Sequence, residues 1–258
     1  FPLGETLVTW TVEDASGNIE TATQLVTVID TEKPTITAPQ AITISTDSGV
    51  CEASGVDLGT PETGDNCSVA SVSNDAPAVF PLGETLVTWT VEDASGNIET
   101  ATQLVTVIDT EKPTITAPGA ITVSTDAGLC EASGVDLGTP ETGDNCSVAS
   151  VSNDAPAVFL LGETLVTWTV IDASGNIETA TQLVTVIDTE KPTITAPQSI
   201  TISSDSGVCE ASGVDLGTPE TGDNCSVASV SNDAPAVFLL GETLVTWTVI
   251  DASGNIET

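Results

Sequence analysis

One stretch of about 79 residues recurs along this chain almost unchanged. The segment Leu-Val-Thr-Trp-Thr-Val occurs four times, and its tryptophans, Trp10, Trp89, Trp168 and Trp247, are spaced by 89 − 10 = 168 − 89 = 247 − 168 = 79 residues. Such a period indicates one small folded unit copied in series rather than one large domain. We therefore expect a function that an array of similar domains performs, such as spacing, tethering or adhesion.

The period divides the 258 residues into four copies. Copy 1 (1–30) is the C-terminal part of a repeat, copy 2 (31–109) and copy 3 (110–188) are full repeats, and copy 4 (189–258) is expected to lack its last strand. A domain of this size has a modest core and usually needs a disulfide, a metal or a neighbour to be stable. Because the sequence starts and stops within a repeat, we interpret it as a section of a longer polypeptide, in which neighbouring repeats are the first expected partners.

The apolar residues alternate as they do in β-strands. In the segment 85–92, Val87, Trp89 and Val91 fall on one face and threonines on the other, and a second long strand is expected over 99–108. About seven short strands per copy, with turn residues between them and no helical period, predict an all-β chain of tandem immunoglobulin-like β-sandwich domains arranged end to end. Each tryptophan is interpreted as a core residue, with sugar stacking at the surface as the alternative.

Composition and charge exclude several classes of function. With 38 acidic residues, 3 Lys or Arg and a net charge of −35, the chain is not expected to bind nucleic acid or an anionic membrane surface. No apolar run is long enough for direct membrane insertion. Nucleophilic catalysis needs a base beside Ser or Cys, and the sequence has no histidine. We therefore expect that the protein is not an enzyme.

The six cysteines follow the same period, two per copy from copy 2 onward. Regularly spaced cysteines in an acidic, strand-rich array are typical of disulfides in a secreted or cell-surface protein, whereas zinc fits poorly without Cys-x-x-Cys or histidine. The alternative is a set of buried free thiols. The residues concerned are Cys51, Cys67, Cys130, Cys146, Cys209 and Cys225.

An ordered set of motifs in copy 2 and at the start of copy 3 resembles the hyalin repeat, or HYR, domain family, as found in tandem in large secreted bacterial surface adhesins. The motifs are Gly-Val-Cys-Glu-Ala (49–53), Asp-Asn-Cys-Ser (65–68), Phe-Pro-Leu-Gly-Glu-Thr (80–85), Trp-Thr-Val-Glu-Asp-Ala-Ser-Gly-Asn (89–97) and Val-Ile-Asp-Thr-Glu-Lys-Pro (107–113). The resemblance implies an immunoglobulin-related sandwich, a role in extracellular adhesion and a disulfide between Cys51 and Cys67. A loop of about 15 residues closed in this way would contribute roughly 3 kcal/mol in the chain-entropy model.

Acidic residues are predicted to gather at the junctions between copies. Alternate loops of such a sandwich share one end, so two acidic loops of each copy should meet the incoming linker there. Oxygen ligands of this kind suit Ca²⁺, which would neutralise their mutual repulsion. The alternative is that Asp-Ala-Ser-Gly-Asn is only a turn and the acids are solvated. The three predicted sets are Asp30, Glu32, Asp65, Asn66, Asp93 and Asn97; Asp109, Glu111, Asp144, Asn145, Asp172 and Asn176; and Asp188, Glu190, Asp223, Asn224, Asp251 and Asn255.

These features predict the structural stalk of a large extracellular adhesin or surface filament. Calcium at the domain junctions and one disulfide per domain would make the stalk rigid. Two alternatives remain open: repeated modules that bind cell-surface or environmental glycans or proteins by avidity, and a self-assembling sheath or lattice protein.

Overall fold

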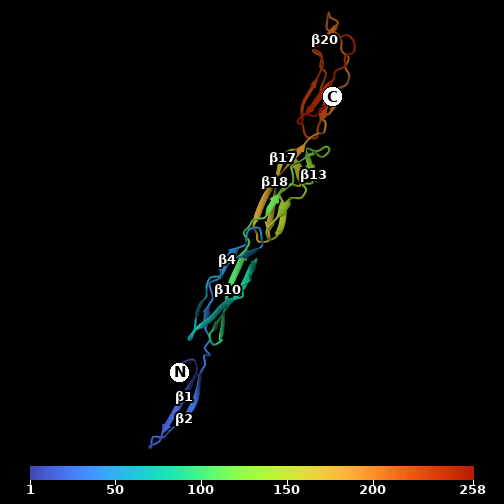
Figure 1. Cartoon of the computed structure of the whole chain (residues 1–258). Coiled ribbons are helices and arrows are strands. Elements are labelled where there is room, and N and C mark those ends of the chain that lie inside the picture. The colour runs from blue at the N-terminus through green and yellow to red at the C-terminus, as the bar shows by residue number, and fades with distance from the viewer. The chain divides into compact units, whose positions relative to one another are not determined.

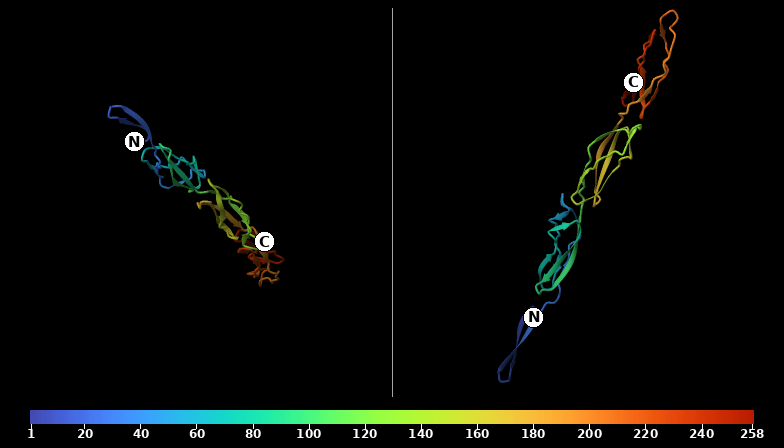
Figure 2. Two further views of the ribbon diagram at one scale, coloured as in Figure 1. Left: turned by 90° about the horizontal axis from the view of Figure 1, so that it is seen from below. Right: turned by 90° about the vertical axis from the view of Figure 1, so that its right-hand side faces the viewer.

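The structure, a computed structural model, describes residues 1–258 and is all-β, with no helix and 52% of the residues in strands (Figure 2). It therefore contains no helix of the length and apolarity that a membrane crossing requires. The chain forms two compact units. Unit 1 comprises 1–112 with the loop segments 144–147 and 173–176, and unit 2 comprises 113–143, 148–172 and 177–258.

Unit 1 contains the hairpin of copy 1 and the complete set of strands of copy 2. The hairpin pairs two ten-residue strands, β1 and β2, in antiparallel register, and Figure 1 shows it at the N-terminal end. The strands are β1 (Gly4–Glu13), β2 (Ile19–Val28), β3 (Thr35–Thr37), β4 (Ile42–Ser45), β5 (Glu52–Ser54), β6 (Glu62–Gly64), β7 (Val69–Asn74), β8 (Val79–Pro81), β9 (Gly83–Asp93) and β10 (Ile98–Ile108).

The two long strands of copy 2 build its main sheet. β9 and β10 pair antiparallel as the centre of a four-stranded sheet of order β4-β10-β9-β7, in which β4 runs parallel to β10. Alternation along β9 places Val87, Trp89 and Val91 in the interior, where Trp89 is 6% exposed. The predicted strands over 85–92 and 99–108 are therefore confirmed, and so is the core position of Trp89. The same expectation is wrong for Trp10, which is 63% exposed in the two-stranded hairpin of copy 1.

Short strand pairs form the second layer of the sandwich. β3 pairs with β6 and β5 with β8. One hydrophobic cluster contains Ala53 and Phe80 from the second pair together with Trp89, Val105 and Val107 from the main sheet. The core of the copy therefore lies between the short strands and the inner face of the long ones.

Unit 2 repeats this plan for copy 3 and for much of copy 4. Its four-stranded sheet has the order β12-β18-β17-β15, and Trp168 takes the place of Trp89. The strands are β11 (Thr114–Thr116), β12 (Ile121–Ser124), β13 (Glu131–Ser133), β14 (Glu141–Gly143), β15 (Val148–Asn153), β16 (Val158–Leu160), β17 (Gly162–Asp172), β18 (Ile177–Ile187), β19 (Thr193–Thr195), β20 (Glu210–Ser212), β21 (Glu220–Gly222), β22 (Val227–Asn232), β23 (Val237–Leu239), β24 (Trp247–Asp251) and β25 (Ile256–Glu257).

The disulfides differ from the predicted pairing. Cys51 bonds Cys146 within unit 1, and Cys130 bonds Cys225 within unit 2, each over a sequence separation of 95 residues. Cys67 and Cys209 are free and exposed. The pairing of Cys51 with Cys67, and of the equivalent cysteines in copies 3 and 4, is therefore wrong. Each bond instead joins the first cysteine of one copy to the second cysteine of the next.

Cys51 and Cys67 lie in different parts of the copy. Between Cys51 and Cys67 the chain enters β5, which pairs with β8, and then β6, which pairs with β3. Cys51 follows the turn closed by the bond from the Val50 amide to Asp47, whereas Cys67 lies in the loop beside Asp65. The bonded cysteines have their Cα atoms 4.7 Å apart, within the narrow range that a disulfide spans. That proximity occurs between the turn of one copy and the loop of the next.

Candidate metal centre

Three aspartates of unit 2 converge where copy 3 ends and copy 4 begins. Asp188 directly follows β18, Asp223 directly follows β21, and Asp251 is the last residue of β24. Each offers a carboxylate oxygen, and these oxygens lie within 4.8 Å of one another. Asp188 and Asp251 are 7% and 2% exposed. The geometry is that of a buried acidic triad built from one linker and two loops.

Hydrogen bonds to backbone amides fix the two loop aspartates. Oδ2 of Asp223 accepts bonds from the amides of Cys225 and Ser226 at 2.9 and 2.8 Å. Oδ1 of Asp251 accepts from the amides of Ser253 and Asn255 at 2.9 and 2.7 Å. Aspartates that bind their own following amides stabilise tight turns. The Asp-Ala-Ser-Gly-Asn motif is therefore a turn, as its alternative reading supposed, and this turn also delivers a carboxylate to the triad.

The same bonds shift one of the titratable groups. Burial raises the pKa of Asp251, but bonds from the Asn255 side chain and from the Asn255, Gly254 and Ser253 amides outweigh burial and hold its pKa below the usual value. Asp93 in unit 1 has a lowered pKa with the same balance of causes. Both aspartates are therefore anionic at neutral pH.

Three oxygens at this junction are buried without a hydrogen-bond partner. They are Oδ2 of Asp188, Oδ1 of Asp223 and Oδ1 of Asn224. The other side-chain atoms of these residues are engaged: Oδ1 of Asp188 accepts from the Glu190 amide and from Nδ2 of Asn224 at 3.1 and 3.2 Å. A buried anionic or amide oxygen without a donor is costly. The arrangement therefore favours a positive ion among these oxygens.

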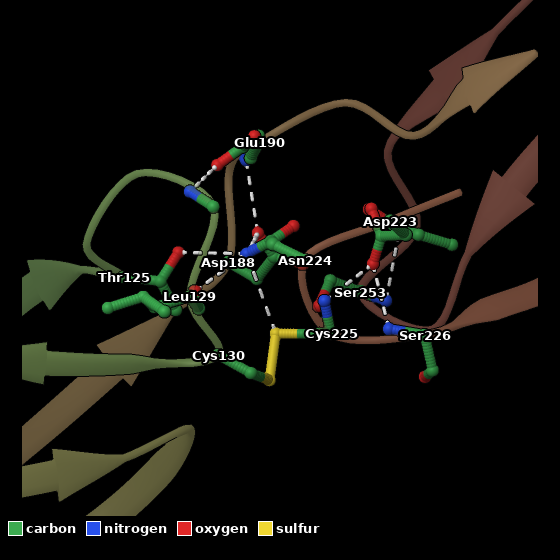
Figure 3. Close-up of a disulfide and its surroundings, with 12 residues drawn as sticks. Thr125, Leu129, Cys130, Asp188, Glu190, Asp223, Asn224, Cys225, Ser226 and Ser253 are labelled. Atoms are coloured by element: carbon green, nitrogen blue, oxygen red, sulfur yellow. Dashed lines mark hydrogen bonds between the residues drawn. A yellow bond between two sulfur atoms is a disulfide. The ribbon is translucent and has the colours of Figure 1, made fainter.

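The remaining predicted residues of the set tie the two copies together. Nδ2 of Asn224 also donates to the carbonyl of Leu129 at 2.9 Å, beside the Cys130–Cys225 disulfide (Figure 3). Oε2 of Glu190 accepts from the Gly128 amide at 2.8 Å and so contacts the turn of copy 3. Nδ2 of Asn255 donates to the Asp188 carbonyl at 3.2 Å. Glu190 is thus a bridge between the copies, outside the acidic triad.

Unit 1 contains a second triad, formed by Asp30, Asp65 and Asp93 with oxygens within 4.8 Å of one another. Oδ2 of Asp30 and Oδ1 of Asp65 are again buried without a partner. Nδ2 of Asn66 donates to Asp30 at 3.3 Å, Nδ2 of Asn97 donates to Asp93 at 2.7 Å, and the Glu32 amide donates to Asp30 at 3.1 Å.

The free thiol of Cys67 lies beside the unit 1 triad. A hydrogen bond to Asp30, burial, and the negative charges of Asp30, Asp65 and Asp93 raise its pKa. It is therefore a protonated thiol at neutral pH.

The remaining predicted set is divided between the units. Asp109, Glu111, Asp144, Asn145 and Asn176 belong to unit 1, and Asp172 belongs to unit 2. Nδ2 of Asn145 donates to Oδ1 of Asp109 and to the Val50 carbonyl at 3.3 and 3.2 Å, and Oε2 of Glu111 accepts from the Gly49 amide at 2.9 Å. Nδ2 of Asn176 donates to the Asp109 carbonyl at 3.2 Å. These bonds reproduce those of Asn224, Glu190 and Asn255 in unit 2.

The predicted aspartates of unit 2 and of the N-terminal set in unit 1 do lie together, and their role as metal ligands stays a prediction. The sequence did not indicate the groups that link one copy to the next. Nδ2 of Asn224 donates to the Leu129 carbonyl at 2.9 Å and to the Thr125 hydroxyl at 3.4 Å. Neither residue belongs to a sequence motif that would have indicated this contact. The inter-copy disulfide likewise escaped detection, because the period is equally consistent with pairing within and between copies.

Comparisons with known proteins agree on one family. The model of the HYR domain matches residues 29–107. The chain is 36% identical to hyalin of Lytechinus variegatus over 281 aligned positions, which cover 100% of the chain and 52% of that protein. It is 35% identical to hyalin of Strongylocentrotus purpuratus, covering 99% of the chain and 23% of that protein. The chain thus spans about half or less of the length of these relatives.

Solved cadherin-type structures give weaker likenesses. A protocadherin gammaB7 EC3-6 cis-dimer structure matches with a TM-score of 0.35 and 16% identity, over 99% of this chain and 76% of that one. Mouse cadherin-23 EC22-24 matches with a TM-score of 0.34 and 13% identity, over 71% and 74%. The sequence matches, together with the motifs that recur at each copy, show that the chain belongs to the HYR domain family.

Proposed function

We propose that this chain is part of the stalk of an extracellular adhesin or surface filament, in which the HYR copies act as spacers and calcium ions rigidify the junctions between them. The observation that carries the proposal is the set of buried, unpartnered oxygens beside each inter-copy disulfide. The domains would be copies 2, 3 and 4, with boundaries at the acidic linkers that begin with Asp30, Asp109 and Asp188.

The chemistry of the donors favours calcium over other cations. All donors are carboxylate or amide oxygens, and the sequence has no histidine. Ca²⁺ accepts six to eight such ligands in irregular geometry, whereas Mg²⁺ requires a near-ideal octahedron, and thiolate or imidazole ligands are typical of zinc. Asp188, Asp223, Asp251 and Asn224 would supply protein ligands in unit 2. When bound, the ion supplies positive charge and no catalytic chemistry.

An ion at this place would act on the junction. Asp188 is the last residue of copy 3, whereas Asp223 lies in a loop of copy 4 and Asp251 is the last residue of β24 in copy 4. Three carboxylates within 4.8 Å repel one another, so without a cation the linker and the loops are pushed apart. A bound cation reverses the sign of this interaction and ties the linker to both loops. The junction then resists bending, which is what a stalk requires.

Several features support an extracellular location and an adhesive role. Two disulfides favour an oxidising compartment. The net charge of −35 disfavours nucleic acid and anionic membranes as partners, and it keeps such repeats soluble. Relatives named hyalin align with 99–100% of the chain. The partners would be neighbouring repeats and glycans or proteins at a cell surface.

Calorimetric titration of the full chain with Ca²⁺, together with thermal unfolding, tests the proposal. Calcium at about 100 times its Kd should stabilise the folded chain by about 2.7 kcal/mol, with a smaller effect from equimolar Mg²⁺. Asp188→Asn should weaken binding at the unit 2 site while keeping the acceptor for the Glu190 amide. Asp215→Asn removes the same charge from an acid that caps only its own turn at Gly217 and should bind calcium normally.

Small-angle scattering before and after chelation tests the mechanical part of the proposal. Chelation should increase the conformational spread of the full chain and shorten its average end-to-end distance. If calcium changes neither the unfolding temperature nor the scattering, the calcium junction is wrong.

A further inference from the structure

The two disulfides overlap along the sequence. One closes the loop from Cys51 to Cys146, and the other closes the loop from Cys130 to Cys225. Because Cys130 precedes Cys146, the two loops share the segment that runs from Cys130 to Cys146. Every residue from 51 to 225 therefore lies inside at least one closed loop. Within-copy pairing would instead have left long open segments between small loops.

We infer that these overlapping disulfides form a covalent lock against stretching, so that tension on the array bypasses the long core strands of copies 2 and 3. Consider tension applied at the two ends of the chain. The shortest covalent path between Cys51 and Cys225 runs through the first disulfide to Cys146, back along the shared segment to Cys130, and through the second disulfide to Cys225. Tension follows this shortest path once it is taut.

The path leaves the long core strands without load. β9 and β10 lie between Cys51 and Cys130, and β17 and β18 lie between Cys146 and Cys225. Both segments are slack when the short path is taut. Only the shared segment, which contains the short strands β13 and β14, transmits the force. This segment contains only about 16 residues (146 − 130), so its full extension is short even when β13 and β14 detach from their partner strands.

The maximum extension between Cys51 and Cys225 differs greatly with and without the disulfides. Without disulfides, the 174 residues from Cys51 to Cys225 (225 − 51) could extend to about 610 Å at roughly 3.5 Å per residue. With both bonds intact, the path contains about 16 residues (146 − 130), or about 56 Å, and two disulfides with Cα–Cα spans of 4.7 Å. The lock thus removes about 550 Å of extension, and it does so even if the cores unfold.

Cys67 and Cys209 fit the same scheme. A partner 95 residues before Cys67 or after Cys209, at the separation seen in both bonds, would fall outside residues 1–258, and both thiols are exposed. Their free state is therefore consistent with pairing strictly between consecutive copies.

The value of such a lock to the organism rests on the proposed stalk function, but the lock itself depends only on the disulfides and not on calcium. We therefore perform the test in the presence of a calcium chelator. The full chain carries Cys67→Ser and Cys209→Ser to prevent exchange, is oxidised with glutathione disulfide, and is pulled from both ends by single-molecule force spectroscopy through non-thiol handles. Dithiothreitol is then added, and each disulfide accepts two electrons to give two thiols while the reductant becomes a cyclic disulfide.

Reduction should lengthen the fully stretched chain by about 550 Å, the extension of about 158 residues (174 − 16). The variant with Cys51→Ser and Cys146→Ser keeps one bond, so its oxidised path from residue 51 to Cys225 contains about 79 residues (130 − 51) and should be about 220 Å longer than that of the oxidised parent.

Contour length is the decisive readout because it shows which cysteines are bonded. The local sequence does not distinguish the possible partners, since Cys67, Cys146 and Cys225 all lie in Asp-Asn-Cys-Ser. In the parent, a bond between Cys130 and Cys146 would give a gain of only about 56 Å on reduction. That gain, or stepwise release of whole copies in the oxidised parent, would overturn the lock. A missing calcium effect on stiffness would leave it intact.

Discussion

Gln103 is the most completely buried polar side chain of copy 2, at 1% exposure. Both the oxygen and the nitrogen of its side-chain amide make hydrogen bonds. Its Oε1 accepts the indole N–H of Trp89 at 3.0 Å, and its Nε2 donates to the carbonyls of Gln40 and Leu58 at 2.9 and 3.1 Å. One amide thus links the main sheet to two irregular segments of the opposite layer. A buried network of this kind is stabilising only while every member is paired.

Replacing this amide should be costly. Gln103→Leu keeps a similar volume but leaves the Trp89 N–H and two carbonyls without partners, at about 1–3 kcal/mol for a group left unpaired. We expect a loss of roughly 3 kcal/mol in the free energy of unfolding, measured by urea titration. Gln24→Leu is the matched control, because Gln24 bonds the indole of Trp10, which is 63% exposed. Equal losses in both variants would contradict this account.

Asp47 provides a pH-dependent contact at the turn before Cys51. Hydrogen bonds from the Ser54 hydroxyl and amide, at 2.6 and 2.9 Å, hold the pKa of this carboxyl below its usual 3.8. A lowered folded-state pKa means that the contact stabilises the fold above the unfolded value and is lost as pH falls through the lower folded value. NMR titration should show this low pKa, and Ser54→Ala should move it upward. An unchanged titration in Ser54→Ala would refute the assigned cause.

At the scale of single residues, the alternation of apolar and polar residues along the strands predicted which residues are buried. It did not predict which hydrogen bonds the buried polar atoms make. Trp89 could be assigned to the core because it lies on the apolar face of a strand. Gln103 lies in the next strand, β10, which is equally regular, and its role depends on the register that sets it opposite Val87. A glutamine follows each of Trp10, Trp89 and Trp168 at one constant spacing, and this recurrence was the available signal.

Among the elements, the long strands were predictable and the shortest ones were not. β9 and β10 carry ten or more residues of alternating pattern, which only a half-buried strand explains. β6 consists of Glu-Thr-Gly, which has no alternating apolar pattern, and it becomes a strand only because β3 pairs with it. β5 is likewise limited to the three residues Glu52–Ser54. Such short elements are set by tertiary contacts rather than by local propensity.

The turn before Cys130 should depend on a residue of the following linker. Oε2 of Glu190 accepts from the Gly128 amide at 2.8 Å, and Gly128 has a φ of +72°, which disfavours other residues there. Glu190→Ala removes the acceptor, so hydrogen exchange at the Gly128 amide should accelerate. The Leu129 amide, bonded to the Asp126 carbonyl at 2.9 Å, is the internal reference.

Glu190→Gln should restore most of the protection, because its side-chain carbonyl is still an acceptor. Unchanged exchange at Gly128 in Glu190→Ala would show that the turn is held by its own bonds alone. Exchange that accelerates equally at Leu129 would indicate general loss of the turn rather than loss of one contact.

At the scale of the whole molecule, the period predicted an all-β array but not its covalent connectivity. The short spacing from Cys51 to Cys67 and the long spacing from Cys51 to Cys146 both recur with the period, so no sequence pattern distinguishes them. The pairing depends on which segments of consecutive copies the fold brings within disulfide distance. The 95-residue separation also raises the entropic contribution of each bond from roughly 3 to about 4.7 kcal/mol in the chain-entropy model.

Overlapping loops should also make the chain resistant to single cuts. A specific protease site placed at 154–157, between β15 and β16, lies inside the loop closed by Cys130 and Cys225. After complete cleavage, a denaturing gel without reductant should show one species of full mass, and reductant should separate it into two. A site at Ser16–Gly17, in the turn between β1 and β2, lies outside both loops and should release a fragment under either condition. If the cut at 154–157 releases fragments without reductant, the copies are not joined by the Cys130–Cys225 bond, because that loop is the only one that encloses the cut.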